Sequence, residues 1–407
     1  MIKTVYLRNA PADDAALKSA TGGDVVTVVH AVPGAWLEQT QTWLYEQTRA
    51  LRDHTDSHVA CPKTMNLEQF WLPNIHTDVS RPMIRRLAEH MARQLRLRRT
   101  SSLAGAVARQ FDASILHSHF GYTAWRQIPA ARRMGLKHVV TFYGLDVNHL
   151  PRHGWMKRYR AMFGHIDLVL CEGPHMARCI VGLGCDERKV HVHHLGVNLE
   201  KIPFRPLEWT SAIPLRCLIA ASFREKKGIP FALEALGRIA ADTPLDVTVI
   251  GDAAPSKASQ AERKRIIETI QRCNLGSRVR MLGFQPHDVV LREAERHHLF
   301  LQPSVTAASG DTEGGAPICL IEMMASGLIC IATHHCDIPE VVNHGRTGWL
   351  APERDVDALA DCLRRAIDRR KEWPAIRQAG REHVQREFDS KVQAERLADI
   401  YRSLARA

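Results

Sequence analysis

The sequence predicts an α/β protein built from two Rossmann-like, doubly wound parallel-sheet domains that face each other across a cleft. The chain has 407 residues, which is more than one hydrophobic core usually supports. Apolar residues make up 45% of it and charged residues 24%, an ordinary composition for a globular protein. In both halves, short β-branched runs alternate with helical segments, and this pattern is typical of parallel sheets covered by helices.

The expected elements follow this pattern in order. In the first half, strands are expected at 4–7, 24–30, 114–119, 138–144 and 167–172, and helices at 41–52 and 104–111. In the second half, strands are expected at 214–222, 245–252, 278–284, 299–304 and 328–333, and helices at 229–241, 261–274 and 288–295.

Prolines between the halves interrupt both periodicities and predict an extended linker over 203–214. We therefore expect one domain over 1–205 and a second over 206–388. A C-terminal helix at about 389–407 is expected to pack back on the first domain. Because sheets of this type bind ligands at the carboxyl ends of their strands, the cleft between the domains is the expected site.

Positive charge is concentrated in the first half. Residues 1–210 hold 27 Lys and Arg against 18 Asp and Glu, out of a net charge of +11 for the chain. Much of the excess lies in residues 81–99, which predict a basic amphipathic helix that binds an anionic membrane surface. The alternative is a solvated helix that covers its own domain. Nucleic acid is not an expected partner, because the stretch has no interleaved aromatic residues.

The sequence shows neither a signal-peptide pattern nor an apolar run long enough to span a membrane. Its ten cysteines form no C-x-x-C pair, so neither a zinc site nor a redox motif is indicated. We expect a cytoplasmic protein, with peripheral association at the inner face of the cell membrane as an option.

The densest group of candidate site residues lies between Glu313 and Glu322. Two glycines follow Glu313 and free the backbone for close approach to a ligand, and Pro317 suits the first turn of the next helix. The N–H groups at such a helix start favour phosphate. Glu322 is the only charge in an apolar helix, so we expect it to be buried and partnered, either by ligand hydroxyls or by an arginine.

A second group follows the first strand of the second half. Arg224 and Lys227 lie in a basic turn, where they could neutralise a leaving diphosphate; a solvated basic loop is the alternative. Gly251 and Phe284 end the next two strands and could form a pocket for a base, or they could be plain turns.

In the first half, Gly34 lies in a loop that could reach a phosphate or a hydroxyl. His117 and His119 share one face of a strand, which suits either a metal pair or hydrogen-bonded core histidines. We interpret the adjacent histidine pairs as incidental, because neighbours in a strand point to opposite faces: His193–His194, His297–His298 and His334–His335.

The segment EGGAPICLIEMMASGL, at 313–328, resembles the acid–x–acid signature of the family 4 glycosyltransferases, and ATHHCDIPEVVNHGRTGWLAP is similar to the family's next block. Eight residues separate the two acids here, where the family usually has seven. The resemblance covers the second half and, more loosely, the first. It implies a GT-B fold and a retaining glycosyltransferase that uses a UDP-sugar or GDP-sugar, most similar to bacterial exopolysaccharide enzymes of the colanic-acid type.

The same resemblance implies roles for individual residues. Glu313 would hold hydroxyls of the transferred sugar, Glu322 would hold the ribose hydroxyls, and Lys227 with Arg224 would neutralise the diphosphate. The segment around the helix start would face the sugar and diphosphate: Gly314, Gly315, Ala316, Pro317 and Ile318.

On the acceptor side, His119 would touch the reacting sugar. Tyr143 stands where the family usually has a histidine, while Asp146 is kept and could orient its neighbours. The acceptor would be a glycan or a lipid-linked saccharide, bound by the first domain.

No cofactor is expected, and the reaction should be independent of metal, because no D-x-D motif lies among other ligands. The sequence nominates no carboxylate nucleophile, which favours front-face transfer with retention. Two kinds of alternative stay open. One is a nucleotide-sugar epimerase or a phosphorylase of the same fold. The other is a non-catalytic basic protein that binds membrane or nucleic acid.

Overall fold

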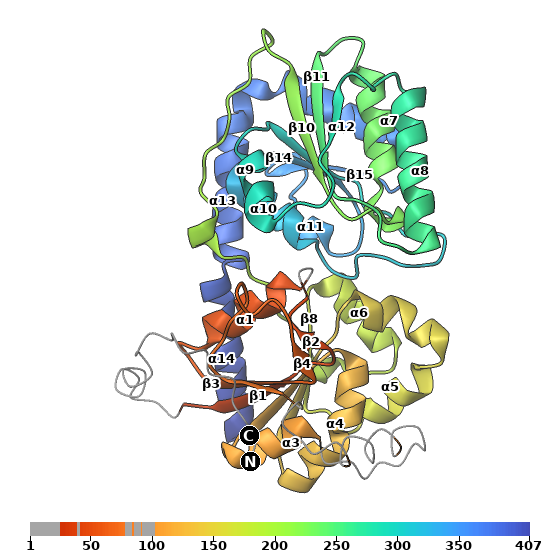
Figure 1. The fold of residues 1–407 in the computed structure, drawn as a ribbon. Helices are drawn as coiled ribbons and strands as arrows, with labels where there is room; N and C mark the ends of the chain where they lie inside the picture. Colours follow the sequence, from red (N-terminus) through yellow and green to blue (C-terminus); the bar gives the residue numbers. More distant parts are fainter. Residues whose placement is uncertain (1–24, 39–40, 78–83, 85–90, 92–101) are drawn as a thin grey trace. The chain divides into compact units, whose positions relative to one another are not determined.

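The computed structural model describes residues 25–38, 41–77, 84, 91 and 102–407. The chain divides into two compact units, Met1–Gly196 with Ser390–Ala407, and Val197–Asp389 (Figure 1). The second unit begins before the expected boundary at 205/206, because Val197 and Ile202 pack into its core. The strand expected at 4–7 lies outside the described residues. So does the basic segment 81–99, apart from Ile84 and Met91, which are both exposed.

The first unit is built on a parallel sheet of order β5-β3-β1-β6-β7-β8-β9. Its strands are β1 (Thr27–Ala31), β3 (Asp56–Cys61), β5 (Ile75–Thr77), β6 (Ile115–His119), β7 (Lys137–Thr141), β8 (Leu168–Cys171) and β9 (Val190–Val192). A small second sheet pairs β2 (Ala35–Trp36) with β4 (Lys63–Thr64). The strand order reverses between β1 and β6, and sheets of this class bind ligands at that switch point.

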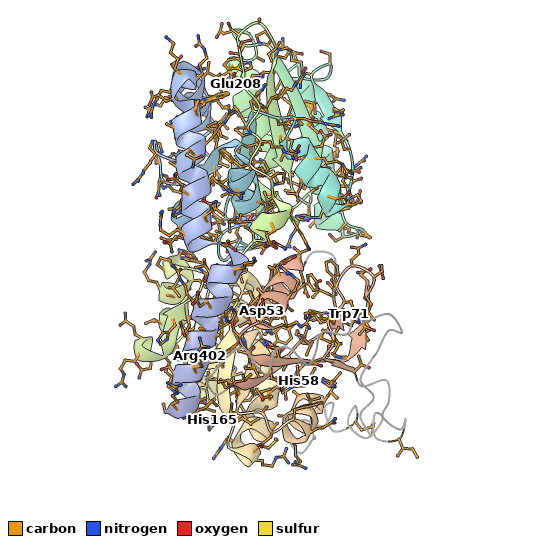
Figure 2. The ribbon with its side chains drawn as sticks, turned by 90° about the vertical axis from the view of Figure 1, so that its left-hand side faces the viewer. Asp53, His58, Trp71, His165, Glu208 and Arg402 are labelled. Carbon is orange, nitrogen blue, oxygen red and sulfur yellow. The ribbon has the colours of Figure 1, made fainter. Side chains whose placement is uncertain are left out.

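Helices cover both faces of this sheet. They are α1 (Thr42–Leu51), α3 (Leu103–Gln110), α4 (Gly121–Met134), α5 (Met156–Phe163), α6 (Pro174–Gly182) and α14 (Ser390–Arg406). Helices α3 and α4 share one apolar cluster with the strands, and α14 packs through Leu397 and Tyr401 against another. Figure 2 shows α14, which carries Arg402, running along the strands of this unit. Short helical turns connect the remaining elements: η3 (Leu145–His149), η4 (Pro151–His153), η5 (Glu187–Lys189) and η6 (Leu199–Lys201), the last within the second unit.

The second unit has a parallel sheet of order β12-β11-β10-β13-β14-β15. Its strands are β10 (Leu215–Ala220), β11 (Leu245–Ile250), β12 (Val279–Met281), β13 (Leu299–Gln302), β14 (Ile329–Thr333) and β15 (Gly348–Ala351). In order of occurrence along the chain this is 3-2-1-4-5-6, the order of dinucleotide-binding sheets, and its switch point lies between β10 and β13.

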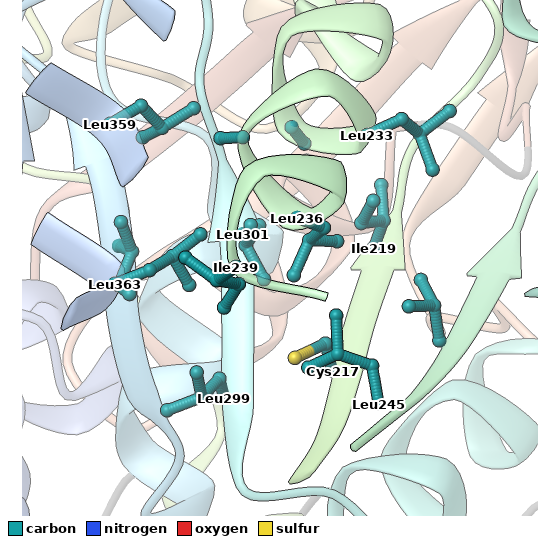
Figure 3. Close-up of a cluster of buried hydrophobic side chains, with 14 of the residues drawn as sticks. Cys217, Ile219, Leu233, Leu236, Ile239, Leu245, Leu299, Leu301, Leu359 and Leu363 are labelled. Atoms are coloured by element: carbon teal, nitrogen blue, oxygen red, sulfur yellow. The ribbon is translucent and has the colours of Figure 1, made fainter. Parts of the chain in front are cut away.

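Its helices are α7 (Ile229–Ile239), α8 (Lys257–Arg272), α9 (His287–Ala294), α10 (Ile318–Ser326), α11 (Ile338–Val341), α12 (Val356–Asp368) and α13 (Trp373–Glu387), with short turns η7 (Glu225–Lys227) and η8 (Arg370–Glu372). One face of the sheet packs against α7 and α12, where Ile219, Leu236 and Leu363 belong to one buried apolar cluster (Figure 3). The other face packs against α9 and α10 (Figure 1).

The predicted fold class, two Rossmann-like doubly wound domains, is confirmed by these two sheets. Among the described residues, no helix has both the length and the apolar character needed to cross a membrane.

Candidate active site

The switch point of the second unit brings together two residues that the sequence nominated separately. Lys227 ends η7, the turn that follows β10 after four residues, and Glu313 lies in the loop after β13. The Lys227 Nζ is 2.8 Å from the Glu313 Oε2. Close backbone approach makes this contact possible: Gly228 has φ 64°, and a Cβ there would lie 1.8 Å from the Pro303 carbonyl oxygen. Any other residue at position 228 would therefore push the lysine turn away from β13.

The Glu313 carboxylate is buried but remains ionised. Its side chain is 6% exposed, and Ser304 Oγ donates to Oε1 at 2.8 Å. Burial by itself would raise the pKa of Glu313, but Lys227 and Lys226 outweigh burial and hold this pKa at about 2. The site therefore carries a fixed negative charge beside two ammonium groups, of which the sequence pattern indicates only Lys227.

Lys226 is the cation that sequence reasoning missed. Its Nζ donates to the Thr312 carbonyl at 2.6 Å and lies 3.8 Å from Glu313 Oε2. Burial lowers its pKa, while Glu313 and Asp311 act in the opposite direction. Arg224, the predicted arginine, is instead half-exposed and bonded to Asp311 at 2.5 Å. The cation beside Lys227 in this structure is thus Lys226, because the η7 turn points it inward.

The helix start after Glu313 is a cradle of backbone donors. Gly314 adopts φ 85°, and α10 begins at Ile318, with Pro317 directly before it rather than inside its first turn. Within the part of the chain that the structure describes, the N–H groups of Gly315, Ala316 and Ile318 have no acceptor. With no acid in the first turn of α10, this end of the helix favours an anion.

Glu322 is buried, as predicted, but its partner is neither an arginine nor a ligand. The residue is 8% exposed, and its Oε1 lies 2.8 Å from Nε2 of His287, the first residue of α9. The His287 side chain is 47% exposed, whereas the Glu322 side chain is 10% exposed. The contact therefore joins a buried acid to a histidine at the surface of the unit.

Gly251 and Phe284 lie at neighbouring strand ends. The Gly251 N–H donates to the Gly283 carbonyl at 2.8 Å, which joins the turn after β11 to the turn after β12. A Cβ at Gly251 would lie 1.9 Å from the Ala221 carbonyl oxygen. Phe284 is 62% exposed, three residues before His287. An exposed ring at this position offers a face for a nucleobase to stack on.

His335 belongs to this site, in contrast to the expectation that the pair His334–His335 is incidental. The Glu313 N–H donates to His335 Nε2 at 3.1 Å, so the ring proton is on Nδ1, which donates to Glu353 Oε1 at 2.6 Å. Glu353 also accepts from the Thr306 N–H at 2.7 Å. His335 therefore ties the Glu313 loop to the loop after β15. These segments are far apart in the sequence and meet only in the folded chain. The spacing of two adjacent histidines therefore could not reveal the role of His335.

In the first unit, the family resemblance implies that His119 touches the reacting sugar. The structure buries this residue fully. Its Nδ1 is 2.9 Å from the Tyr143 hydroxyl, and its Nε2 is 3.1 Å from His30 Nδ1. Because both ring nitrogens are already hydrogen-bonded, His119 acts in this structure as a core residue that positions Tyr143.

His117 belongs to a second series of buried hydrogen bonds, beside the series that links His30, His119 and Tyr143. Its Nδ1 is 2.6 Å from the Tyr401 hydroxyl on α14, and its Nε2 is 2.7 Å from Thr141 Oγ1. His30, His117 and His119 lie close enough to hold an ion. However, each imidazole already has hydrogen-bond partners, and the cluster itself supplies no carboxylate to offset a buried dication. The hydrogen-bonded interpretation of the pair is therefore the better one.

Asp146 orients the end of β7 and the start of α4. It lies in η3 and accepts from the Gly121 N–H at 2.9 Å, from the Tyr143 N–H at 3.1 Å and from the Tyr159 hydroxyl at 2.9 Å. Burial raises the pKa of Asp146 to about 7, although these hydrogen bonds act to lower it.

Gly34 is exposed between β1 and β2, with no atom within 4 Å of a Cβ built there. It lies at the switch point but makes no close approach of its own.

The buried histidines predict acid sensitivity of the first unit. Burial is the largest cause that lowers the pKa of His30, His138 and His193 to about 3. The unfolded chain binds protons near pH 6.5 and the folded chain does not, so stability is present above pH 6.5 and is lost as the pH falls toward 3. We expect each histidine to cost on the order of 1–2 kcal/mol between pH 7 and pH 5.

Urea unfolding followed by tryptophan fluorescence at the two pH values measures this effect. His138→Asn should reduce the pH dependence. The control is His165→Asn, which replaces an exposed histidine of the same unit (Figure 2) and should leave the dependence unchanged. Equal pH dependence in all three proteins would contradict the expectation.

Comparison with known proteins agrees with this geometry. The sequence profile described as glycosyl transferases group 1 matches residues 214–383, and the profile described as glycosyltransferase family 4 matches residues 40–201. The amylovoran biosynthesis glycosyltransferase AmsK of Erwinia amylovora is 31% identical over 310 residues, which is 75% of this chain and 74% of that protein. The putative colanic acid biosynthesis glycosyltransferase WcaL of Escherichia coli K12 is also 31% identical, over 311 residues, with the same two shares covered.

Among solved structures, a glycosyltransferase from Rickettsia africae superposes with a TM-score of 0.73 at 16% identity, covering 94% of this chain and 99% of its own. HepE from Anabaena, in complex with UDP, also has a TM-score of 0.73 at 17% identity, covering 93% and 100%. At such identities these structures show the GT-B fold alone. The fold and the curated relatives together define the class: this chain is a glycosyltransferase. More narrowly, it belongs to the family 4 glycosyltransferases.

Proposed function

We propose that this glycosyltransferase moves a sugar from a nucleotide diphosphate-sugar to an acceptor hydroxyl with retention of anomeric configuration. The observation that carries the proposal is the Lys227–Glu313 pair, 2.8 Å apart at the switch point of the second unit. A sugar diphosphate has hydroxyls at one end and phosphate charge at the other. The bond that breaks joins the sugar to the diphosphate. The carboxylate matches the sugar hydroxyls on one side of this bond, and the ammonium group matches the phosphate charge on the other side.

The surrounding groups support a donor site on the second unit. Lys227, Lys226 and the free N–H groups at the start of α10 would stabilise charge on the departing diphosphate. Glu322 would hold the ribose hydroxyls, and Phe284 would stack on the base. Glu313 would bind hydroxyls of the transferred sugar once Lys227 turns toward the phosphates.

We propose that the reaction needs no metal, because these cations and amide dipoles supply the charge that a divalent ion supplies elsewhere. Among the described carboxylates of the donor site, Glu313 would be bound by Ser304 and by sugar hydroxyls, and Glu322 by the ribose, so neither is assigned as a nucleophile. Transfer would then occur on the front face, with the leaving phosphate accepting the acceptor's proton.

The first unit would bind the acceptor, and Asp146 and His119 would position groups there rather than react. The relatives' roles in amylovoran and colanic acid biosynthesis support an acceptor in bacterial exopolysaccharide or lipid-linked glycan synthesis. We place the reaction at the cytoplasmic face of the membrane. The segment 81–99, for which a membrane contact is expected from the sequence, lies almost entirely outside the described residues.

A thermal-shift panel of UDP, GDP, ADP and their sugars tests the donor site. One nucleotide series should raise the melting temperature, by an amount that grows with ligand concentration, and the shift should be the same in EDTA and in Mg²⁺. A response to none of these ligands, or a shift that EDTA removes, would contradict the proposed donor site or its independence of metal.

A further inference from the structure

A continuous row of aromatic rings leads from the end of β7 to the surface of the first unit. The row consists of Tyr143, Phe120, Tyr122 and Trp155. Ring centroids are 4.6 Å apart between Tyr143 and Phe120, 5.6 Å between Phe120 and Tyr122, and 6.3 Å between Tyr122 and Trp155. We call these four residues the aromatic row.

The exposure of the aromatic row changes along its length. Tyr143 and Phe120 are buried, whereas Tyr122 and Trp155 are half-buried. Phe120 follows β6 directly and holds φ 72°, a left-handed conformation that is costly for an aromatic residue and that clusters at functional sites. The strained residue lies at the carboxyl edge of the sheet. The turn at Phe120 leads the row of rings from that edge to the solvent.

Two arginines stack on the exposed end of the row. The Arg126 guanidinium lies 5.8 Å from the Tyr122 ring centroid, and the Arg158 guanidinium lies 4.9 Å from the Trp155 ring centroid. Neither arginine forms an ion pair with any residue that the structure describes. Their donors are therefore held in place by the rings but remain available to an anion.

Charges of both signs lie near the row, but the stretch of chain that carries it is basic. Residues 113–166 contain eight Lys and Arg and a single carboxylate, Asp146, which is fully buried. From other elements, Glu38 lies near Tyr122, and Glu172 lies near Tyr143. At the arginine-bearing end, Asp146 and Glu38 both act on Tyr122, together with Arg126. The two guanidinium groups stacked on the rings have no ion pair among the described residues, and they favour a ligand with negative charge.

We propose that the aromatic row, with Arg126 and Arg158, binds the acceptor, and that the acceptor is a saccharide carrying an anionic group. Half-exposed rings offer apolar faces for the C–H faces of pyranose rings, and guanidinium forks match carboxylate or phosphate. This assignment rests on the proposed function, since it names the acceptor class of that reaction. The anion could be a sugar carboxylate or the diphosphate of a lipid carrier.

Direct binding to the full-length protein tests the assignment without relying on transfer. The probes are cellobiose, cellobiouronic acid, which adds one carboxylate to the same disaccharide, and farnesyl diphosphate-linked glucose. Titration calorimetry should show that at least one anionic probe binds roughly ten-fold or more tightly than cellobiose, the scale of one charge-assisted hydrogen bond. The probe that binds identifies the source of the charge.

The double variant Arg126→Gln/Arg158→Gln should lose this preference for the anionic probe. Its control is Arg132→Gln/Arg133→Gln, which removes the same net charge from exposed positions on α4 and should bind as the parent does. Trp155→Leu should weaken binding of all saccharide probes while the nucleotide-induced thermal shift stays unchanged.

Three results would overturn the assignment. The first is equal affinity for cellobiose and both anionic probes, and the second is no binding of any probe. The third is an equal loss of affinity for the anionic probe in the two double variants. Failure of the proposed function would look different. The nucleotide series would then give no thermal shift, whatever the saccharide probes do.

Discussion

Lys227→Ala is expected to lower the rate of sugar transfer by about 100- to 1000-fold, the usual effect of removing one group that stabilises charge on a leaving oxyanion. Lys227 is 17% exposed at its side chain and bonds a carboxylate that is 6% exposed. Its ammonium group is thus held in a poorly solvated place, where it acts strongly on a diphosphate. The rate should fall mainly in kcat, because the phosphate charge grows as the bond breaks.

The same substitution leaves the buried Glu313 charge with only the more distant Lys226. Breaking such a buried pair costs about 3–5 kcal/mol in stability, so lost activity could simply reflect unfolding. The double variant Lys227→Ala/Glu313→Gln removes both charges and should recover much of the lost stability without recovering transfer. If the double variant regains both, Lys227 has a structural role only.

Glu322→Ala is expected to abolish most of the nucleotide-induced thermal shift. Losing hydrogen bonds to a charged group costs about 1.5–3 kcal/mol, or roughly 10- to 100-fold in Kd. The free protein should remain stable, because the partner His287 is already half exposed and is not left buried without a hydrogen bond.

Glu293→Ala is the matched control. Glu293 is also a buried acid of the second unit, 5% exposed, but its partners are two arginines, Arg280 at 2.7 Å and Arg296 at 3.2 Å. This variant should lower the melting temperature yet keep the full shift on adding nucleotide. A normal shift in Glu322→Ala, or a lost shift in Glu293→Ala, would show that the ribose assignment is wrong.

Local sequence patterns were enough to predict the fold and the donor segment. Strands β13 and β14 are fully buried, and β10 and β11 are buried at all but one position, so their mainly apolar composition reveals them. Strand β15 is also buried but was not predicted. The glycine turn, the helix start and the stop at Gly327 are also encoded locally. Strand β3 was not predicted, because its Asp56, Ser57 and His58 hide the expected apolar pattern. The polar side chains of Ser57 and His58 are buried. Ser57 is hydrogen-bonded to Thr55 and His58 to His76, which offsets the free-energy cost of burying them.

The contacts that define the site come from tertiary structure. Lys227 and Glu313 are 86 residues apart in the chain, and only the 3-2-1-4-5-6 strand order places their strand ends together. His119 shows the opposite case. Its motif matches the family, but His30, 89 residues away, and Tyr143 occupy its ring nitrogens. No local pattern could show that those partners would bury it.

One measurement tests the central claim most directly: following the anomeric signals of donor and product by NMR during transfer, in EDTA, with the nucleotide-sugar that the thermal-shift panel selects. We expect a new glycosidic signal of the same anomeric configuration as the donor, appearing together with free nucleoside diphosphate. An inverted product, a requirement for added metal, or conversion of the nucleotide-sugar to its epimer without an acceptor would contradict retaining, metal-independent transfer at the Lys227–Glu313 site.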